Sequence, residues 1–443
     1  MNALLKPNMY HTFSFKRKRY VFLSGSQQIL EITNPTLDAY FKICNGEEQR
    51  EALPSSTLAQ LTNALAAYCR LPQRHQAEQR QKMLTLNVTS GCNMACKYCF
   101  ATTSDKKEAM PLKVAEQAIR NMLENNPAGE QFTLYFFGGE PLLHKAFIKD
   151  VVAIAKKEII AKRGKRVSFM VNTNGTLLDD ELLKFFKKED FVVTVSLDGP
   201  KDINDANRVY PNGKGSYEKI ADAIERLKKH HVRFNVRATI DPATSHLPDI
   251  VQFFEEAKVP YAYAFTMDFG KESQNASHSD EKLLKNMDKQ LGESMNYLTK
   301  KGLNGDYIYS MDFRKSLNML KNRAIRLQGC SAGRNSLIVD ERGNYYSCQN
   351  MLPLGNTSVG NVNEGVQDEK LNRLQPEEVT KLEKCNQCWA KFLCGGACMA
   401  ERYFHGKDSP HLDQKCQLIQ LEWKHWMHAF ITLENQNLNK LNY

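Results

Sequence analysis

The sequence has 443 residues, of which 42% are hydrophobic and 25% are charged, with a formal net charge of +10. This length allows two or three domains with sizeable cores. No run of roughly eighteen apolar residues is present, and the first residues lack the apolar core of a signal peptide, so we expect a cytoplasmic protein with no membrane contact. The basic residues are scattered over predicted helix faces rather than gathered in one stripe, which argues against a nucleic-acid partner.

Residues 1–75 predict a small separate module in which strands precede helices. Stretches at 11–15, 20–23 and 28–32 are typical of three short strands, the first two of which flank a basic turn. Asn34-Pro35-Thr36 predicts the start of one helix, because proline suits a first helical turn. The leucines that follow Ser55 recur at the helical period and predict a second helix.

Residues 76–315 predict a domain in which strands and helices alternate. Repeated strand–helix units imply a parallel sheet with helices on its faces. Ligands of such folds bind at the carboxyl ends of the strands, so the residues that follow each strand are the first candidates for a site. The six expected strands cover residues 83–89, 132–137, 167–172, 191–197, 233–239 and 260–265.

The twelve cysteines of a cytoplasmic chain indicate metal binding rather than disulfides. Cys92, Cys96 and Cys99 form a C-x3-C-x2-C motif directly after the first strand. Three thiolates on one loop can hold three irons of a [4Fe–4S] cube and leave the fourth iron open, whereas electron-transfer clusters usually have four cysteine ligands. A zinc site is the alternative, but zinc sites favour C-x2-C pairs and four ligands.

This motif, with Tyr98 before its last cysteine, resembles that of the radical S-adenosylmethionine (radical SAM) enzymes. The resemblance implies a partial (β/α)6 barrel in an α/β fold. It also implies that SAM binds the open iron through its amino and carboxylate groups. An electron from the cluster then cleaves SAM to a 5′-deoxyadenosyl radical, which takes a hydrogen atom from a C–H bond of the substrate.

Further residues at the predicted strand ends match family positions that contact SAM. Phe137-Gly138-Gly139-Glu140 follows the second strand, and glycine lets the backbone approach a ligand closely. The alternative for nearby Asn174, Asp198 and Asp205 is that they cap helices or form turns. The resemblance implies cofactor contacts for Tyr98, for Gly138, Gly139 and Glu140 at the SAM amino group, for Ser196 and Arg208 at the ribose and carboxylate, and for Asn172.

Residues 316–443 contain seven more cysteines, whose spacing is similar to that of the SPASM domain of peptide-modifying radical SAM enzymes. The resemblance implies two auxiliary [4Fe–4S] clusters, three clusters in all. Residues 331–347 contain no cysteine, so the second auxiliary cluster is expected to have an open iron or a ligand other than cysteine. The implied ligand sets are Cys385, Cys388, Cys394 and Cys416 for the first and Cys330, Cys348 and Cys398 for the second.

The whole pattern predicts a maturase that cross-links a ribosomally made precursor peptide. Residues 1–75 resemble a winged-helix-type peptide-recognition domain, which would bind the leader of the precursor, and an electron donor such as flavodoxin or ferredoxin is the other expected partner. Thioether, C–C and ether links all stay open, and no catalytic acid or base is identified. The alternatives are an anaerobic sulfatase-maturating enzyme that forms formylglycine and a non-catalytic metal-binding scaffold.

Overall fold

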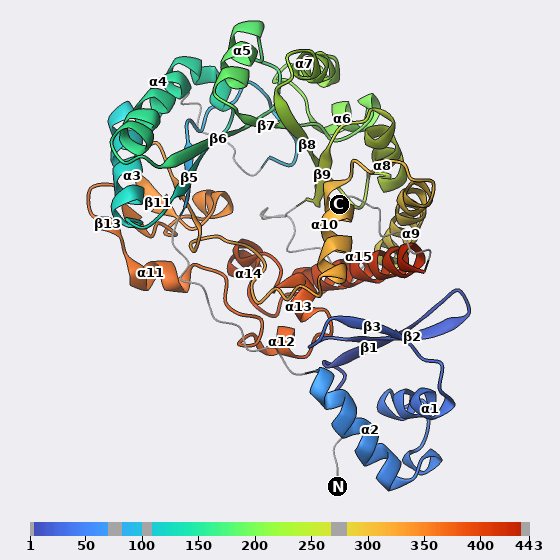
Figure 1. Cartoon of the computed structure of the whole chain (residues 1–443). Helices are drawn as coiled ribbons and strands as arrows, with labels where there is room; N and C mark the ends of the chain where they lie inside the picture. The colour runs from blue at the N-terminus through green and yellow to red at the C-terminus, as the bar shows by residue number, and fades with distance from the viewer. Residues whose placement is uncertain (1–3, 70–81, 100–108, 267–280, 436–443) are drawn as a thin grey trace.

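The computed structural model describes residues 4–69, 82–99, 109–266 and 281–435. The N-terminal module lies apart from the rest of the chain in Figure 1. It consists of an antiparallel sheet of β1 (Tyr10–Phe15), β2 (Lys18–Leu23) and β3 (Gln28–Glu31), followed by α1 (Pro35–Cys44) and α2 (Ser55–Tyr68). The Asn34 side chain caps α1 at the backbone N–H of Thr36. The expected boundary near residue 75 lies in 70–81, outside the described residues.

Six parallel strands follow, and they are the six that the sequence predicts. Helices on the outer side of the sheet surround it in Figure 1. The strands are β4 (Met83–Asn87), β5 (Gln131–Phe137), β6 (Arg166–Thr173), β7 (Val192–Ser196), β8 (Arg233–Ile240) and β9 (Tyr261–Phe265). The helices are α3 (Leu112–Glu124), α4 (Lys145–Ala155), α5 (Asp180–Lys188), α6 (Lys201–Asn207), α7 (Tyr217–Lys229), α8 (Leu247–Glu256) and α9 (Glu281–Leu303).

The alternating burial of side chains along β5 distinguishes the two faces of the sheet. Phe132, Leu134 and Phe136 are fully buried in the main core, whereas Tyr135 and Phe137 between them are only partly buried. Successive side chains of a strand point to opposite faces, so one face packs under the helices and the other faces the inside of the curved sheet. The inner face is therefore where a ligand is accommodated.

The sheet does not end where the sequence predicts. β10 (Ser336–Val339) pairs in parallel with β4, and β11 (Asn344–Tyr346), β12 (Gly360–Asn361) and β13 (Gly365–Val366) continue the same ten-stranded sheet. The expected domain boundary at 315/316 stays a prediction, and in the structure it falls within α10 (Met311–Lys321). The cysteine-rich segment thus shares a sheet with the barrel, since an open edge at β4 offers unpaired backbone groups to β10.

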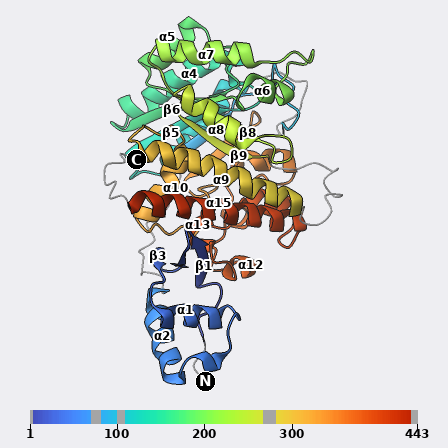
Figure 2. The same ribbon diagram turned by 90° about the vertical axis from the view of Figure 1, so that its right-hand side faces the viewer.

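A long C-terminal helix, α15 (Pro410–Glu434), packs along α9 and closes one side of the barrel, as Figure 2 shows. It begins at Pro410, because the Ser409 side chain caps it and proline suits a first helical turn. Short helices α11 (Asp368–Arg373), α12 (Glu383–Asn386), α13 (Lys391–Cys394) and α14 (Met399–His405) lie before it. No helix in the described ranges combines the length and apolarity that a bilayer crossing requires.

The N-terminal module contacts the cysteine-rich segment through one edge, which we call the module junction. The His11 ring stacks on the Trp389 ring with 4.1 Å between ring centroids. The Ser24 hydroxyl donates to the Trp389 carbonyl at 2.6 Å, and the Asn8 amide donates to the Asn386 carbonyl at 2.6 Å. Both carbonyls belong to the short segment that carries Cys385 and Cys388.

Candidate active site

The segment 88–99 after β4, which we call the cysteine loop, is held in place by the loops that follow the other strands. The backbone N–H groups of Gly139 and Glu140 donate to the carbonyls of Thr89 and Gly91, at 2.8 and 2.9 Å. At the other end of the cysteine loop, the Ala95 N–H donates to the carbonyl of Val209, after α6, and the Lys97 N–H donates to the carbonyl of Asn207, the last residue of α6. The motifs that the sequence analysis singled out therefore meet around one loop.

Gly138 and Gly139 allow the β5 end to approach the cysteine loop. A Cβ atom on Gly138 would lie 2.4 Å from the Thr89 carbonyl oxygen, and the φ of Gly138 is +141°, a value that side chains disfavour. A Cβ atom on Gly139 would lie 2.2 Å from the Gly91 carbonyl oxygen. Both glycines are thus required by backbone packing, and their predicted contact with SAM stays a prediction.

We expect Gly139→Ala to displace the cysteine loop, because the obstructing atom belongs to the backbone and cannot rotate away. The iron that binds to this loop and the rate of SAM cleavage should both fall, the rate by at least ~10-fold. Iron analysis and 5′-deoxyadenosine formation measure the two effects. Gly164→Ala is the control for backbone strain alone, because the φ of Gly164 is +62° and nothing lies within 4 Å of the added methyl group there. Wild-type iron content and rate in Gly139→Ala would contradict this account of the glycine.

The Glu140 carboxylate joins the ends of two strands. Its Oε1 accepts from the Leu142 N–H at 3.0 Å and from the Thr173 hydroxyl at 2.8 Å, and its Oε2 accepts from the Asn174 N–H at 2.7 Å. The side chain is fully buried, and burial raises its pKa to about 7 despite these donors. Its first role is to fix the ends of β5 and β6, and the predicted contact with the SAM amino group stays a prediction.

Asn174 combines turn formation with a contact to the cysteine loop. Its Oδ1 accepts from the Thr176 N–H at 3.0 Å, as the turn interpretation predicts. Its amide nitrogen donates to Asn93 at 2.9 Å and lies 3.9 Å from the Cys92 sulfur. Asn172, the residue expected to contact SAM, lies near the end of the same strand and is partly buried.

Tyr98, Asp198 and Arg208 form a buried network that the sequence analysis missed as a unit. The Tyr98 hydroxyl donates to Asp198 Oδ2, and the Thr239 N–H donates to Asp198 Oδ1 at 2.9 Å. The Arg208 Nε lies 3.0 Å from the same Oδ1, and the guanidinium lies 5.4 Å from the Tyr98 ring centroid. Asp198 is 0% exposed and Arg208 is 7% exposed, so each charge depends on the other.

This network brings two of the predicted SAM contacts, Tyr98 and Arg208, together beside the cysteine loop. Burial and the neighbouring thiols raise the pKa of Cys96 to about 11, although the nearby Arg208 charge lowers it. Ser196, the third predicted contact, is buried at the end of β7, two residues before Asp198. Tyr98, Arg208 and Ser196 thus lie at one edge of the barrel, where the cysteine loop, α6 and β7 end.

The three thiols of the cysteine loop fit a cluster better than a single ion. Each is partly buried, and the charges of Cys92, Cys96 and Cys99 act on one another, so they share one site. Zinc sites favour four ligands, whereas the cysteine loop offers three thiols. Burial raises the pKa of Cys92 and Cys96, so a strongly cationic partner is needed to keep them as thiolates.

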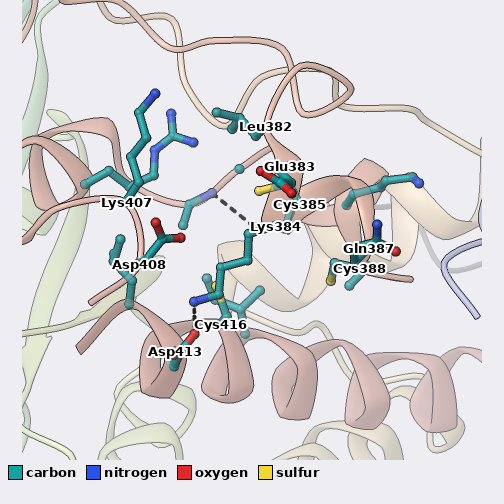
Figure 3. Close-up of a pocket in the computed structure, with 18 of the residues that line it drawn as sticks. Leu382, Glu383, Lys384, Cys385, Gln387, Cys388, Lys407, Asp408, Asp413 and Cys416 are labelled. Atoms are coloured by element: carbon teal, nitrogen blue, oxygen red, sulfur yellow. Dashed lines mark hydrogen bonds and ion pairs between the residues drawn. The ribbon is translucent and has the colours of Figure 1, made fainter. Parts of the chain in front are cut away.

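The structure brings the predicted four-cysteine set to one cavity of about 830 Å³, which Figure 3 shows. The four come from α12, from the residues after it, from α13 and from α15. Burial and the charges of the other thiols raise the pKa of Cys416 to about 12. An ion pair between Lys384 and Asp413 ties α12 to α15 beside the thiols. The set consists of Cys385, Cys388, Cys394 and Cys416.

The predicted three-cysteine set lines a second cavity of about 530 Å³. The charges of Cys330 and Cys398 act on Cys348 and, together with burial, raise its pKa to about 12. Cys394 lines both cavities, so the two thiol sets are neighbours. Ser331 and Ser336 also line this cavity. The other two cysteines, Cys44 and Cys69, lie in the N-terminal module, as expected of structural thiols.

The radical SAM superfamily profile matches residues 86–253, which include the cysteine loop and the ends of β5, β6 and β7. The chain carries a radical SAM domain. The profile covers the strand-end loops of the candidate site, and it ends before the two auxiliary thiol sets.

Curated relatives and solved structures resemble this radical SAM chain beyond the profile. It is 26% identical to the cysteine-type anaerobic sulfatase-maturating enzyme of Clostridium perfringens, over 76% of this chain and 93% of that protein. It is 34% identical to the corresponding Clostridium novyi enzyme, but only over 39% of this chain and 48% of that protein. The structure of anSMEcpe with bound AdoMet matches with a TM-score of 0.67 and 25% identity, over 80% of this chain and 99% of that chain.

A second solved structure matches a larger share of this chain. Streptococcus suis SuiB bound to its precursor peptide SuiA covers 92% of this chain and 97% of that chain, with a TM-score of 0.54 and 14% identity. This likeness concerns the fold alone. It shows that the architecture of almost the whole radical SAM chain, and not only of its barrel, occurs in a known structure.

Proposed function

We propose that this radical SAM protein binds SAM at the cysteine loop and oxidatively modifies a peptide. The observation that carries the proposal is the convergence of the loops after β5, β6 and β7 on Cys92, Cys96 and Cys99. When bound, a [4Fe–4S] cluster with SAM supplies a 5′-deoxyadenosyl radical that abstracts a hydrogen atom. The residues of the chain position this chemistry, exclude water from it and receive the peptide.

The residues at the strand ends around the cysteine loop have separate roles in this proposal. Gly138 and Gly139 let the backbone of the β5 end reach the bound SAM, and Glu140 holds that end against β6. The buried Arg208, oriented by Asp198, presents a positive charge to the SAM carboxylate. Tyr98 connects the cysteine loop to Asp198. This contact fixes the position of the cluster ligands relative to the SAM contacts.

The substrate that we propose is a ribosomally made precursor peptide whose core receives a cross-link. The N-terminal module supports this, because β3 pairs with β2 on one side and with no other described strand on its other edge. Such an edge accepts an extended leader as an added strand. Leader binding raises the effective concentration of the core at the barrel. The two auxiliary thiol sets would hold clusters that take the surplus electron, with flavodoxin or ferredoxin as external electron donor.

A second candidate function is the maturation of a sulfatase by oxidation of a cysteine or serine to formylglycine. The match over 93% of the Clostridium perfringens enzyme favours it. Two features favour the precursor peptide instead. A module of three strands and two helices precedes the cysteine loop, and no cysteine lies between Cys330 and Cys348.

A comparison of two peptides separates the two functions. The reconstituted full-length protein is incubated without oxygen with SAM, dithionite and either a precursor peptide encoded beside it or a sulfatase peptide. A cross-link appears in mass spectrometry as the loss of two hydrogens in the precursor peptide. Formylglycine appears as an aldehyde in the sulfatase peptide. Formation of 5′-deoxyadenosine with neither product would contradict both functions.

We expect deletion of residues 1–75 to lower modification of the precursor by ~100-fold or more while SAM cleavage continues, because the tether is lost and the cysteine loop is not. Leu30→Asp is the sharper variant, because Leu30 is 38% exposed on β3 and its change spares the core of the module. It should raise the KM for the precursor and leave 5′-deoxyadenosine formation unchanged. If the wild type and Leu30→Asp bind the leader with equal affinity, β3 is not the strand that binds the leader.

A further inference from the structure

A partly buried carboxylate, Glu422, faces the cavity of the three-cysteine set and has no role in the functions described above. It lies on α15 and lines the cavity together with Asp312 of α10. Glu422 Oε1 accepts from the Tyr263 hydroxyl at 3.0 Å, and Asp312 Oδ2 accepts from the Tyr263 backbone N–H at 2.9 Å. Two carboxylates thus flank one tyrosine of β9, on the wall of a cavity that also holds Cys330, Cys348 and Cys398.

The carboxylate pair is linked to the end of β7 through Arg237 of β8. Arg237 is paired in register with Ser196 of β7, and its carbonyl accepts from the Leu197 N–H at 3.2 Å. The Arg237 charge also acts on the Asp312 carboxylate. Asp312 and Glu422 themselves line the cavity of the three-cysteine set.

We propose that Glu422 is a catalytic residue that accepts the proton which the substrate loses during its oxidation, and that Asp312 adjusts the basicity of Glu422. This inference rests on the proposed function. The substrate hydrogen atom leaves with the deoxyadenosyl radical, which becomes 5′-deoxyadenosine. The remaining carbon radical forms the new bond to a second group of the peptide, whose bond to hydrogen breaks. One proton passes to the Glu422 carboxylate, and an iron–sulfur cluster, which Cys330, Cys348 and Cys398 would hold in its oxidised form, would take up the remaining electron.

The surroundings of Glu422 suit a base that works near neutral pH. Burial and the nearby Asp312 charge raise its pKa to about 8, against the hydrogen bond from Tyr263 and the charge of Lys415, which lower it. Asp312 on α10, Tyr263 on β9 and Lys415 on α15 are the groups that shift this pKa, and Lys315, Arg326 and the thiols of the three-cysteine set line the same cavity. A structural role alone is served equally well by glutamine, which also accepts a hydrogen bond from Tyr263.

The decisive variant is therefore Glu422→Gln, with Glu293→Gln on the outer helix α9 as the matched control. Cross-link formation should fall ~100-fold or more in Glu422→Gln. The variant should still transfer deuterium from a labelled peptide into 5′-deoxyadenosine, and its iron content should match the wild type. The control should keep both rates. Cross-link formation at the wild-type rate in Glu422→Gln would overturn the inference.

Two further variants shift the pH dependence in opposite directions. Cross-linking by the wild type should rise with pH through about 8, as Glu422 loses its proton. Asp312→Asn removes a neighbouring negative charge and should move this inflection to lower pH, whereas Tyr263→Phe removes a stabilising donor and should move it to higher pH. The infrared band of the protonated carboxyl group, absent in Glu422→Gln, should titrate in parallel without turnover.

The outcomes separate the inference from the proposed function. A wild type that cleaves SAM but modifies neither test peptide contradicts the proposed function, and the inference with it. If the wild type is active but Asp312→Asn and Tyr263→Phe both keep its pH inflection of the cross-linking rate, only the role of Glu422 is overturned. An active wild type with the two opposite shifts supports both.

Discussion

Replacing Cys92, Cys96 and Cys99 together by alanine abolishes SAM cleavage if the cysteine loop binds the catalytic cluster. The reason is that the three thiols share one site, and burial raises the pKa of Cys96 to about 11, so only a bound cation keeps them as ligands. The variant should lose about four iron atoms per chain. Anaerobic iron analysis and the formation of 5′-deoxyadenosine under dithionite measure both effects.

The control for this experiment is the pair Cys44→Ala and Cys69→Ala, because both thiols lie in the N-terminal module. These variants should keep the iron content and the SAM cleavage of the wild type. A triple variant that still cleaves SAM would show that the cysteine loop is not the site. Zinc in place of iron in the wild type would favour the scaffold alternative.

The second large effect is expected from Asp198→Ala. This change leaves Arg208, which is 7% exposed, as a buried charge without its partner, and it removes the acceptors of Tyr98 and of the Thr239 N–H. Breaking one side of a buried ion pair costs about 3 kcal/mol or more of unfolding free energy. Because Arg208 also loses its orientation, SAM binding should weaken at least ~10-fold. Urea unfolding and calorimetric titration with SAM measure the two effects.

Asp202→Ala is the control for this variant, because Asp202 is exposed on α6, four residues away in the sequence. It should change neither stability nor SAM affinity beyond about 0.5 kcal/mol. A normal SAM affinity in a destabilised Asp198→Ala protein would restrict the network to a structural role. Arg208→Lys then serves as a second probe, since lysine keeps the charge but not the planar guanidinium.

The sequence predicts the strands well because their signals are local. Each of the six parallel strands is a short apolar run, and the side chains that bind or turn follow directly after it. The resemblance to the SPASM domain likewise implies two thiol sets, and each set lines one cavity, with Cys394 lining both. In contrast, the extension of the sheet by β10 depends on pairing with β4, about 250 residues earlier in the chain, and no local pattern in Ser336–Val339 specifies that partner.

The buried polar networks are the part that the sequence does not predict. Tyr98 and Asp198 are 100 residues apart and Tyr263 and Glu422 are 159 residues apart, so only the fold brings each pair together. Glu422 lies among Leu421, Trp423 and Trp426, and in sequence it is typical of the polar face of an amphipathic helix. The start of α15 is different, because the local pair Ser409-Pro410 is a helix-start signal in the sequence itself.

The module junction has a consequence for attempts to retarget this protein by exchanging its recognition module. Asn8 and Ser24 donate to carbonyls of the segment that carries Cys385 and Cys388, and His11 covers Trp389. A foreign module grafted onto the barrel would uncover this segment unless it reproduced those three contacts. Chimeras should therefore transplant the face that docks on Trp389 from the native module and vary only the opposite edge.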